Sequence, residues 1–142
     1  MSPVIQPARP APIDAADIER LRGFLATQPA VELAILVGSR ADGTARPGSD
    51  WDIAVQFARD GADFLEQCGR LESLRHKLAG LLGGTEDDVD LIELPRARLA
   101  MRALVAEEGL PLKGEDSLAW GRFLTRTWRD LEDYYWEKAH AA

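Results

Sequence analysis

Apolar and polar positions alternate with two different periods along this chain. Between residues 50 and 57 they alternate one by one, which is typical of a strand with two unlike faces. Apolar runs at residues 31–37 and 89–94 predict two further strands, the first ending at Gly38 and the second at Pro95. Apolar residues at helical spacing predict four helices, which begin near Asp14, after Gly61, at Arg96 and near Asp116 or Ser117.

The order of these elements predicts the fold class. Helix, strand, strand, helix, strand and then helices indicate an α+β or mixed α/β domain, with a small mixed β-sheet, helices packed on it and helices at the C-terminal end. A chain of 142 residues suits one domain, and 46% hydrophobic residues can form its core. Four prolines without periodicity predict a flexible tail over residues 1–12, which leaves residues 13–142 as the single domain.

The net charge and the distribution of apolar residues limit the classes of partner expected for this protein. The net charge is −7 and the basic residues form no large cluster, which argues against direct binding of nucleic acid. No apolar run approaches the ~20 residues of a membrane helix, and the first residues do not resemble a signal peptide. The single cysteine, Cys68, cannot form an internal disulfide, which fits a cytoplasmic protein.

Polar residues suited to ligand binding or catalysis lie at three places. Gly38 and Ser39 directly follow the first strand, where a glycine lets a phosphate approach the backbone. Asp50 and Asp52 share one face of the next strand, and two such close carboxylates favour a cation between them. Mg²⁺ prefers carboxylate and phosphate oxygens. Asp90 opens a later strand, where a solvated sheet edge is an equally good interpretation of that residue in isolation.

Other reactive side chains offer no competing chemistry. His76 lies among charged helix residues and His140 near the chain end, while Cys68 falls on the apolar face of its helix. Their spacing fits neither a zinc site nor a cysteine nucleophile.

Together, Gly38-Ser39, Asp50-Trp51-Asp52 and Asp90 resemble the nucleotidyltransferase superfamily that includes DNA polymerase beta. The Gly-Ser-Arg-x-x-Gly and Ser-Asp-x-Asp forms look most like its minimal nucleotidyltransferase branch. The motif core covers residues 35–57, and the wider resemblance runs to about residue 94.

The resemblance implies a role for each site residue. Asp50 and Asp52 would coordinate two Mg²⁺ ions, and Asp90 would complete one metal site and help to deprotonate the attacking hydroxyl. Gly38 and Ser39 would hold the β- and γ-phosphates of ATP, with assistance from Ser49. Arg40 would either reach a phosphate or lie on the surface.

The resemblance also implies a partner. The sequence is similar to minimal nucleotidyltransferase antitoxins that are encoded beside a HEPN-domain ribonuclease toxin. It therefore implies a hetero-oligomer in which AMP passes from ATP to a toxin tyrosine hydroxyl and blocks RNA cleavage. Two alternatives stay open: a small-molecule (aminoglycoside-like) nucleotidyltransferase, and a non-catalytic antitoxin that acts by binding.

Aromatic residues crowd the last predicted helix. Trp128, Tyr134, Tyr135 and Trp136 mostly continue an apolar stripe, so packing in the core is the favoured interpretation. Three of them are consecutive, however, and a helix cannot bury all three in one direction. At least one is expected on the surface, where it could contact a partner.

Overall fold

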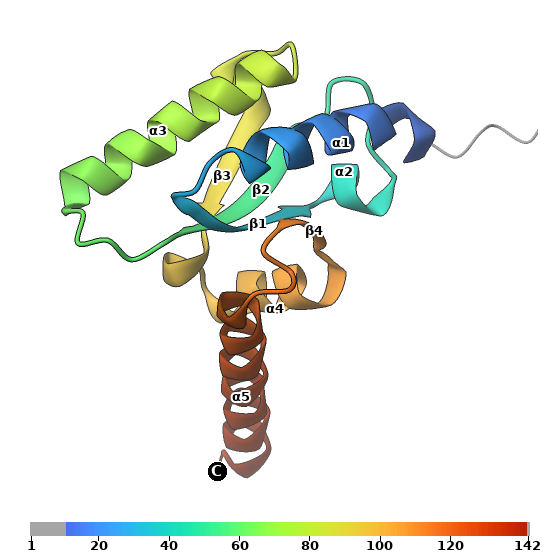
Figure 1. Cartoon of the computed structure of the whole chain (residues 1–142). Coiled ribbons are helices and arrows are strands. Elements are labelled where there is room, and N and C mark those ends of the chain that lie inside the picture. Colours follow the sequence, from blue (N-terminus) through green and yellow to red (C-terminus); the bar gives the residue numbers. More distant parts are fainter. Residues whose placement is uncertain (1–10, 142) are drawn as a thin grey trace, which may run out of the picture.

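The computed structural model describes residues 11–141, which form a four-stranded sheet with helices on both faces (Figure 1). The strands are β1 (Val31–Val37), β2 (Trp51–Phe57), β3 (Val89–Glu93) and β4 (Leu110–Lys113). The α-helices are α1 (Ala11–Ala26), α2 (Ser39–Asp42), α3 (Phe64–Leu81), α4 (Leu99–Glu108) and α5 (Leu118–His140). Two short 3₁₀ turns, η1 (Glu86–Asp88) and η2 (Leu94–Arg96), flank β3.

The sheet is mixed, as the sequence predicts. Its strand order is β3-β2-β1-β4, with β1 antiparallel to both β2 and β4 and with β2 parallel to β3. In this register Val37 lies opposite Asp52, and Asp52 lies opposite Asp90. The α+β class is therefore confirmed, and the pairing brings segments far apart in the sequence to one edge of the sheet.

Two apolar clusters hold the layers together. Helices α1 and α3 cover one face, where Leu21 and Leu78 pack against strand residues such as Ile53. Helix α4 and the first half of α5 cover the other face, where Val105 and Phe123 pack against residues such as Ile35. Burial of one such side chain stabilises the fold by about 1.5–3 kcal/mol, so the clusters fix which face each strand residue takes.

Several element boundaries differ from the sequence-based expectation. Asp14 lies inside α1, which begins at Ala11, so it does not occupy the capping position before the helix. The predicted flexible tail is left largely untested, because residues 1–10 lie outside the described part of the chain. The helix expected from Arg96 begins only at Leu99, because Pro95 and its neighbours form η2. No helix within residues 11–141 is both long and apolar enough to cross a membrane.

The expected burial of the C-terminal aromatic residues is wrong. Phe123 and Thr127 are buried, but the exposed fraction is 40% for Trp128 and 62% for Trp136. Tyr134 and Tyr135 are also exposed. The reason is that α5 runs past the edge of the sheet, and its second half projects away from the body of the protein (Figure 1).

Two glycines near the start of α5 should respond oppositely to substitution by alanine. Gly114 has a φ of +88°, and a Cβ there would lie 2.4 Å from the Glu32 carbonyl oxygen. We expect Gly114→Ala to lower the free energy of unfolding by about 1–3 kcal/mol. Gly121 lies exposed inside α5, where an added Cβ would meet no atom within 4 Å, so Gly121→Ala should raise it by about 0.5–1 kcal/mol. Urea denaturation measures both, and shifts of the same sign would contradict this account.

Candidate active site

Three aspartates lie together at the end of the sheet where strands β2 and β3 begin. Asp52 on β2 and Asp90 on β3 are direct neighbours in the parallel register, and Asp50 immediately precedes β2. Trp51 and Ile53 turn toward α1 and α3, so Asp52 turns to the opposite face. Asp50 and Asp90 are exposed and Asp52 is half-buried. The sequence-based grouping of these carboxylates therefore corresponds to one place in the fold, and β3 is an edge strand on which Asp90 is also solvated.

Gly38 brings the end of β1 against this carboxylate group. Its φ is +77°, a conformation that favours glycine, and a Cβ at this position would lie 2.6 Å from Oδ2 of Asp52. The chain turns here into α2, whose first residue is Ser39. Among the described residues the Ser39 hydroxyl has no hydrogen-bond partner, so it is available to a ligand. Only a residue without a side chain fits between the turn and Asp52.

The loop between α2 and β2 is fastened by Arg40. Its guanidinium donates hydrogen bonds to the carbonyl oxygens of Ser49 (2.8 Å) and Pro47 (3.4 Å) and lies 4.7 Å from the centre of the Trp51 ring. The Ser49 hydroxyl accepts a hydrogen bond from the backbone N–H of Arg46. Sequence reasoning missed this positioning role of Arg40. The proposed role of Ser49 in phosphate binding stays a prediction.

Repulsion between neighbouring carboxylates contributes to the electrostatics of the site. Partial burial raises the pKa of the Asp52 carboxyl, and the negative charges of Asp90 and Asp50 raise this pKa further. The nearby Asp42 behaves in the opposite way, because hydrogen bonds from Thr44 lower the pKa of its carboxyl. The ionised form of Asp52 is thus disfavoured unless a cation neutralises it.

The donor set fits Mg²⁺ by its chemistry. It contains carboxylate oxygens only, which are the protein ligands that Mg²⁺ prefers, and Asp50 and Asp90 are exposed. Within residues 11–141, no three acidic, histidine or cysteine side chains form a ready-made metal cluster. The assignment of two ions to Asp50, Asp52 and Asp90 therefore stays a prediction.

A mixed sheet with carboxylates on neighbouring strands, beside a glycine turn, defines the class of nucleotidyltransferases. The family model "Polymerase beta, Nucleotidyltransferase" matches residues 19–118, and the chain belongs to this family. The match includes Gly38 and all three aspartates, together with the sheet that positions them.

Comparison with known relatives shows which members of this family the chain resembles. The chain is 28% identical over 116 residues to the protein adenylyltransferase MntA of Aphanizomenon flos-aquae, covering 78% of this chain and 76% of that protein. It is 38% identical over 86 residues to the MntA protein of Shewanella oneidensis, covering 61% and 56% of the two chains. A crystal structure of a toxin-antitoxin with AMP-PNP contains a chain with a TM-score of 0.65 and 28% identity, covering 87% of this chain and 93% of that one.

Replacing Asp52 by Asn should stabilise the metal-free protein. A raised pKa means that the stabilising contribution is present below the ordinary value of 3.8 and is lost as the pH rises through the pKa of the folded state. At neutral pH the ionised carboxylate therefore opposes folding. We expect Asp52→Asn to raise the Tm in EDTA by on the order of 1–2 °C.

The matched control is Asp42→Asn, which removes a carboxylate with a lowered pKa and should not raise the Tm. Added Mg²⁺ should raise the Tm of the unaltered protein more than that of Asp52→Asn. Equal responses of these two proteins to Mg²⁺ would contradict the role of Asp52 as a ligand.

Proposed function

We propose that this protein is an antitoxin that transfers AMP from ATP to a tyrosine hydroxyl of a HEPN ribonuclease toxin in the cytoplasm and thereby neutralises it. The observation that carries the proposal is the juxtaposition of Asp50, Asp52 and Asp90 with the Gly38 turn. A protein that acted by binding alone would gain nothing from keeping this repulsive group of carboxylates at one exposed edge.

The proposed reaction moves one nucleotidyl group. The tyrosine oxygen attacks the α-phosphorus of ATP and forms a new P–O bond, while the bond from that phosphorus to the β-phosphate oxygen breaks and pyrophosphate leaves. Asp90 accepts the hydroxyl proton. Gly38 allows the triphosphate to approach the backbone, and the free Ser39 hydroxyl can donate a hydrogen bond to a phosphate oxygen.

Asp50, Asp52 and Asp90 would hold Mg²⁺. The ions, when bound, supply neutralisation of the charge on the attacking oxygen and on the leaving pyrophosphate. The protein's own contribution is to hold its carboxylates in register across two strands, so that donor and acceptor meet in a fixed orientation.

Similarity to known proteins supports ATP as the nucleotide donor and a toxin protein as the partner. The two MntA relatives are named protein adenylyltransferases, and the related crystal structure is a toxin-antitoxin with AMP-PNP, an analogue of ATP. ATP as donor and a toxin protein as acceptor and hetero-oligomer partner are the simplest assignments that agree with these names. The tyrosine acceptor follows from the sequence resemblance to minimal nucleotidyltransferase antitoxins.

Intact-mass spectrometry tests the transfer. The protein is incubated with ATP, Mg²⁺ and the HEPN ribonuclease encoded beside it, and the toxin should gain about 329 Da for each AMP. Asp50→Ala/Asp52→Ala should abolish this gain. Asp87→Ala, which removes an exposed carboxylate from η1, should keep it.

Two other outcomes of this experiment would favour the two alternative functions. Tight binding without any mass gain would favour a non-catalytic antitoxin. Absence of both binding and mass gain would favour a small-molecule acceptor, and either result would overturn the proposal.

The free half of α5 is a candidate surface for the toxin. Tyr135 and Trp136 are each 62% exposed, and residues 132–141 are all exposed. A helical segment of this length without tertiary contacts is only marginally stable in water. Exposed aromatic side chains are also enriched at protein interfaces, so a partner that covers them would stabilise this segment.

Truncation after residue 132 should weaken toxin binding at least tenfold, because aromatic anchors carry a large share of binding energy. Tyr135→Ser/Trp136→Ser should have a similar effect without shortening the helix. Leu65→Ser, which alters an exposed apolar residue on α3, is the matched control and should bind normally. The rise in Tm with Mg²⁺ should persist in all variants, and unchanged affinity of the truncated protein would refute this assignment.

A further inference from the structure

A hollow of about 570 Å³ lies between the C-terminal end of β2 and the first half of α5. Its lining includes Gln56 near the end of β2, Arg59 from the loop after β2, and Arg122 and Arg126 from successive turns of α5. The catalytic carboxylates lie at the other end of the same strand. At the rise of a β-strand, Asp52 and Phe57 of β2 are roughly 16 Å apart, and Arg59 follows in the loop beyond the strand. The hollow is therefore separate from the proposed active site.

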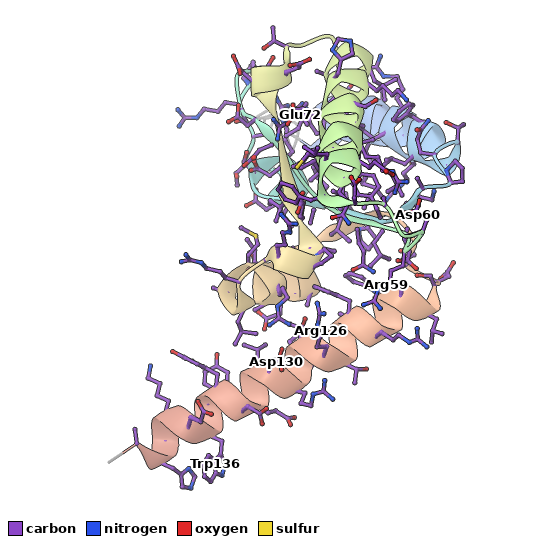
Figure 2. The ribbon with its side chains drawn as sticks, turned by 90° about the vertical axis from the view of Figure 1, so that its left-hand side faces the viewer. Arg59, Asp60, Glu72, Arg126, Asp130 and Trp136 are labelled. Carbon is purple, nitrogen blue, oxygen red and sulfur yellow. The ribbon has the colours of Figure 1, made fainter. Side chains whose placement is uncertain are left out.

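Three guanidinium groups in this hollow are not neutralised. Among the described residues, Arg59, Arg122 and Arg126 form no hydrogen bond or ion pair. Figure 2 shows Arg59 at the end of the sheet and Arg126 on α5, close to each other across the space between these elements. Arg122 and Arg126 are one helical turn apart, a spacing at which like charges repel.

Several other arginines have carboxylate partners. Arg70 donates to Asp60, Arg96 lies 3.3 Å from Glu93, and Arg102 donates to Asp130 at 3.0 Å. In a chain with a net charge of −7, acidic partners are abundant, yet the three guanidiniums that line the hollow lack them. An arrangement of this kind favours a bound anion, and arginine matches phosphate oxygens with paired hydrogen bonds.

One carboxylate also belongs to the hollow. Glu32 is among its lining residues, and its Oε2 accepts a hydrogen bond of 3.0 Å from the Gln56 side chain. Three guanidiniums face this single carboxylate, so the hollow keeps an excess of positive charge. The other carboxylate oxygen of Glu32 can accept a hydrogen bond from a hydroxyl group of a ligand.

The remaining lining is apolar. It consists of five side chains from the sheet end, the turn after β3 and α5: Phe57, Ala58, Pro95, Ala119 and Phe123. A ligand that fits both halves carries a phosphate at one end and an uncharged, partly apolar body with hydroxyl groups at the other. The volume lies within the range of pockets that bind such small molecules.

We propose that this hollow is a second binding site, which takes a nucleoside monophosphate. Arg59, Arg122 and Arg126 hold the phosphate, Glu32 accepts a hydrogen bond from a ribose hydroxyl, and the apolar lining contacts the base. The site binds its ligand without Mg²⁺, because the arginines supply the positive charge directly. It is independent of the ATP site formed by the three aspartates.

Calorimetric titration of the full chain with AMP in EDTA tests the proposal, since chelation removes the ions on which the catalytic edge depends. We expect saturable binding at one site. Arg122→Gln/Arg126→Gln and, separately, Arg59→Gln should weaken it at least tenfold. Arg129→Gln removes an exposed arginine of α5 that does not line the hollow, and should bind AMP normally. Inorganic phosphate should compete weakly, because it lacks the apolar body.

The substituted positions are exposed, so the variants should keep the Tm of the ligand-free protein. Equal AMP affinity in the arginine variants and in Arg129→Gln would overturn the proposal, as would the absence of binding at millimolar AMP. Loss of toxin binding in Arg122→Gln/Arg126→Gln, in a protein that never binds AMP, would assign the hollow to an acidic protein segment and would also overturn it. AMP transfer to the toxin, measured separately, reports on the proposed function alone.

Discussion

Parallel pairing of β2 with β3 is the constraint on which the proposed active site depends. This register alone places Asp52 beside Asp90, and a slip of one residue would turn Asp52 into the apolar layer beneath α1 and α3. Two opposing effects meet here. Repulsion between two carboxylates about 4 Å apart near a protein surface amounts to about 4 kcal/mol, whereas burial of Ile53, Val55 and Leu91 contributes about 1.5–3 kcal/mol for each side chain, or roughly 5–9 kcal/mol together. Burial prevails, so the fold can hold like charges together in the absence of a cation.

The local part of this arrangement could be predicted from the sequence. Alternation over residues 50–57 determines that Asp52 faces away from Trp51 and Ile53, because side chains of a strand alternate between its faces. The choice between a functional and a merely solvated Asp90 could not be made in this way, since an apolar run does not specify its neighbour in the sheet. The same limit applies to Gly38. Its position after a strand is visible in the sequence, but the contact of 2.6 Å that excludes a side chain involves Asp52, fourteen positions further on.

Helix α5 shows why a correct pattern can lead to a wrong conclusion about burial. Its apolar spacing is regular, and Phe123 and Thr127 are indeed buried. A helix of 23 residues, however, is about 35 Å long, whereas a strand of 7 residues extends only about 23 Å. The sheet cannot cover the whole helix, so the aromatic residues after Leu131 remain exposed. Periodicity identifies the face of a helix that is apolar, but the dimensions of the neighbouring layer decide how much of that face is covered.

The two ends of β2 have opposite effects on a negatively charged ligand. At its start, Asp50 and Asp52 repel phosphate, so binding of a nucleotide at the proposed active site would require cations between the carboxylates and the phosphates. At its end, Arg59 and the arginines of α5 attract phosphate directly. The two proposed sites would therefore differ in whether ligand binding depends on a metal ion. Because roughly 16 Å of strand and a packed apolar core separate them, occupancy of one end need not alter the charge at the other. A single short strand thus carries carboxylates at one end and has an arginine just beyond the other, and this separation of charge underlies the two proposed sites.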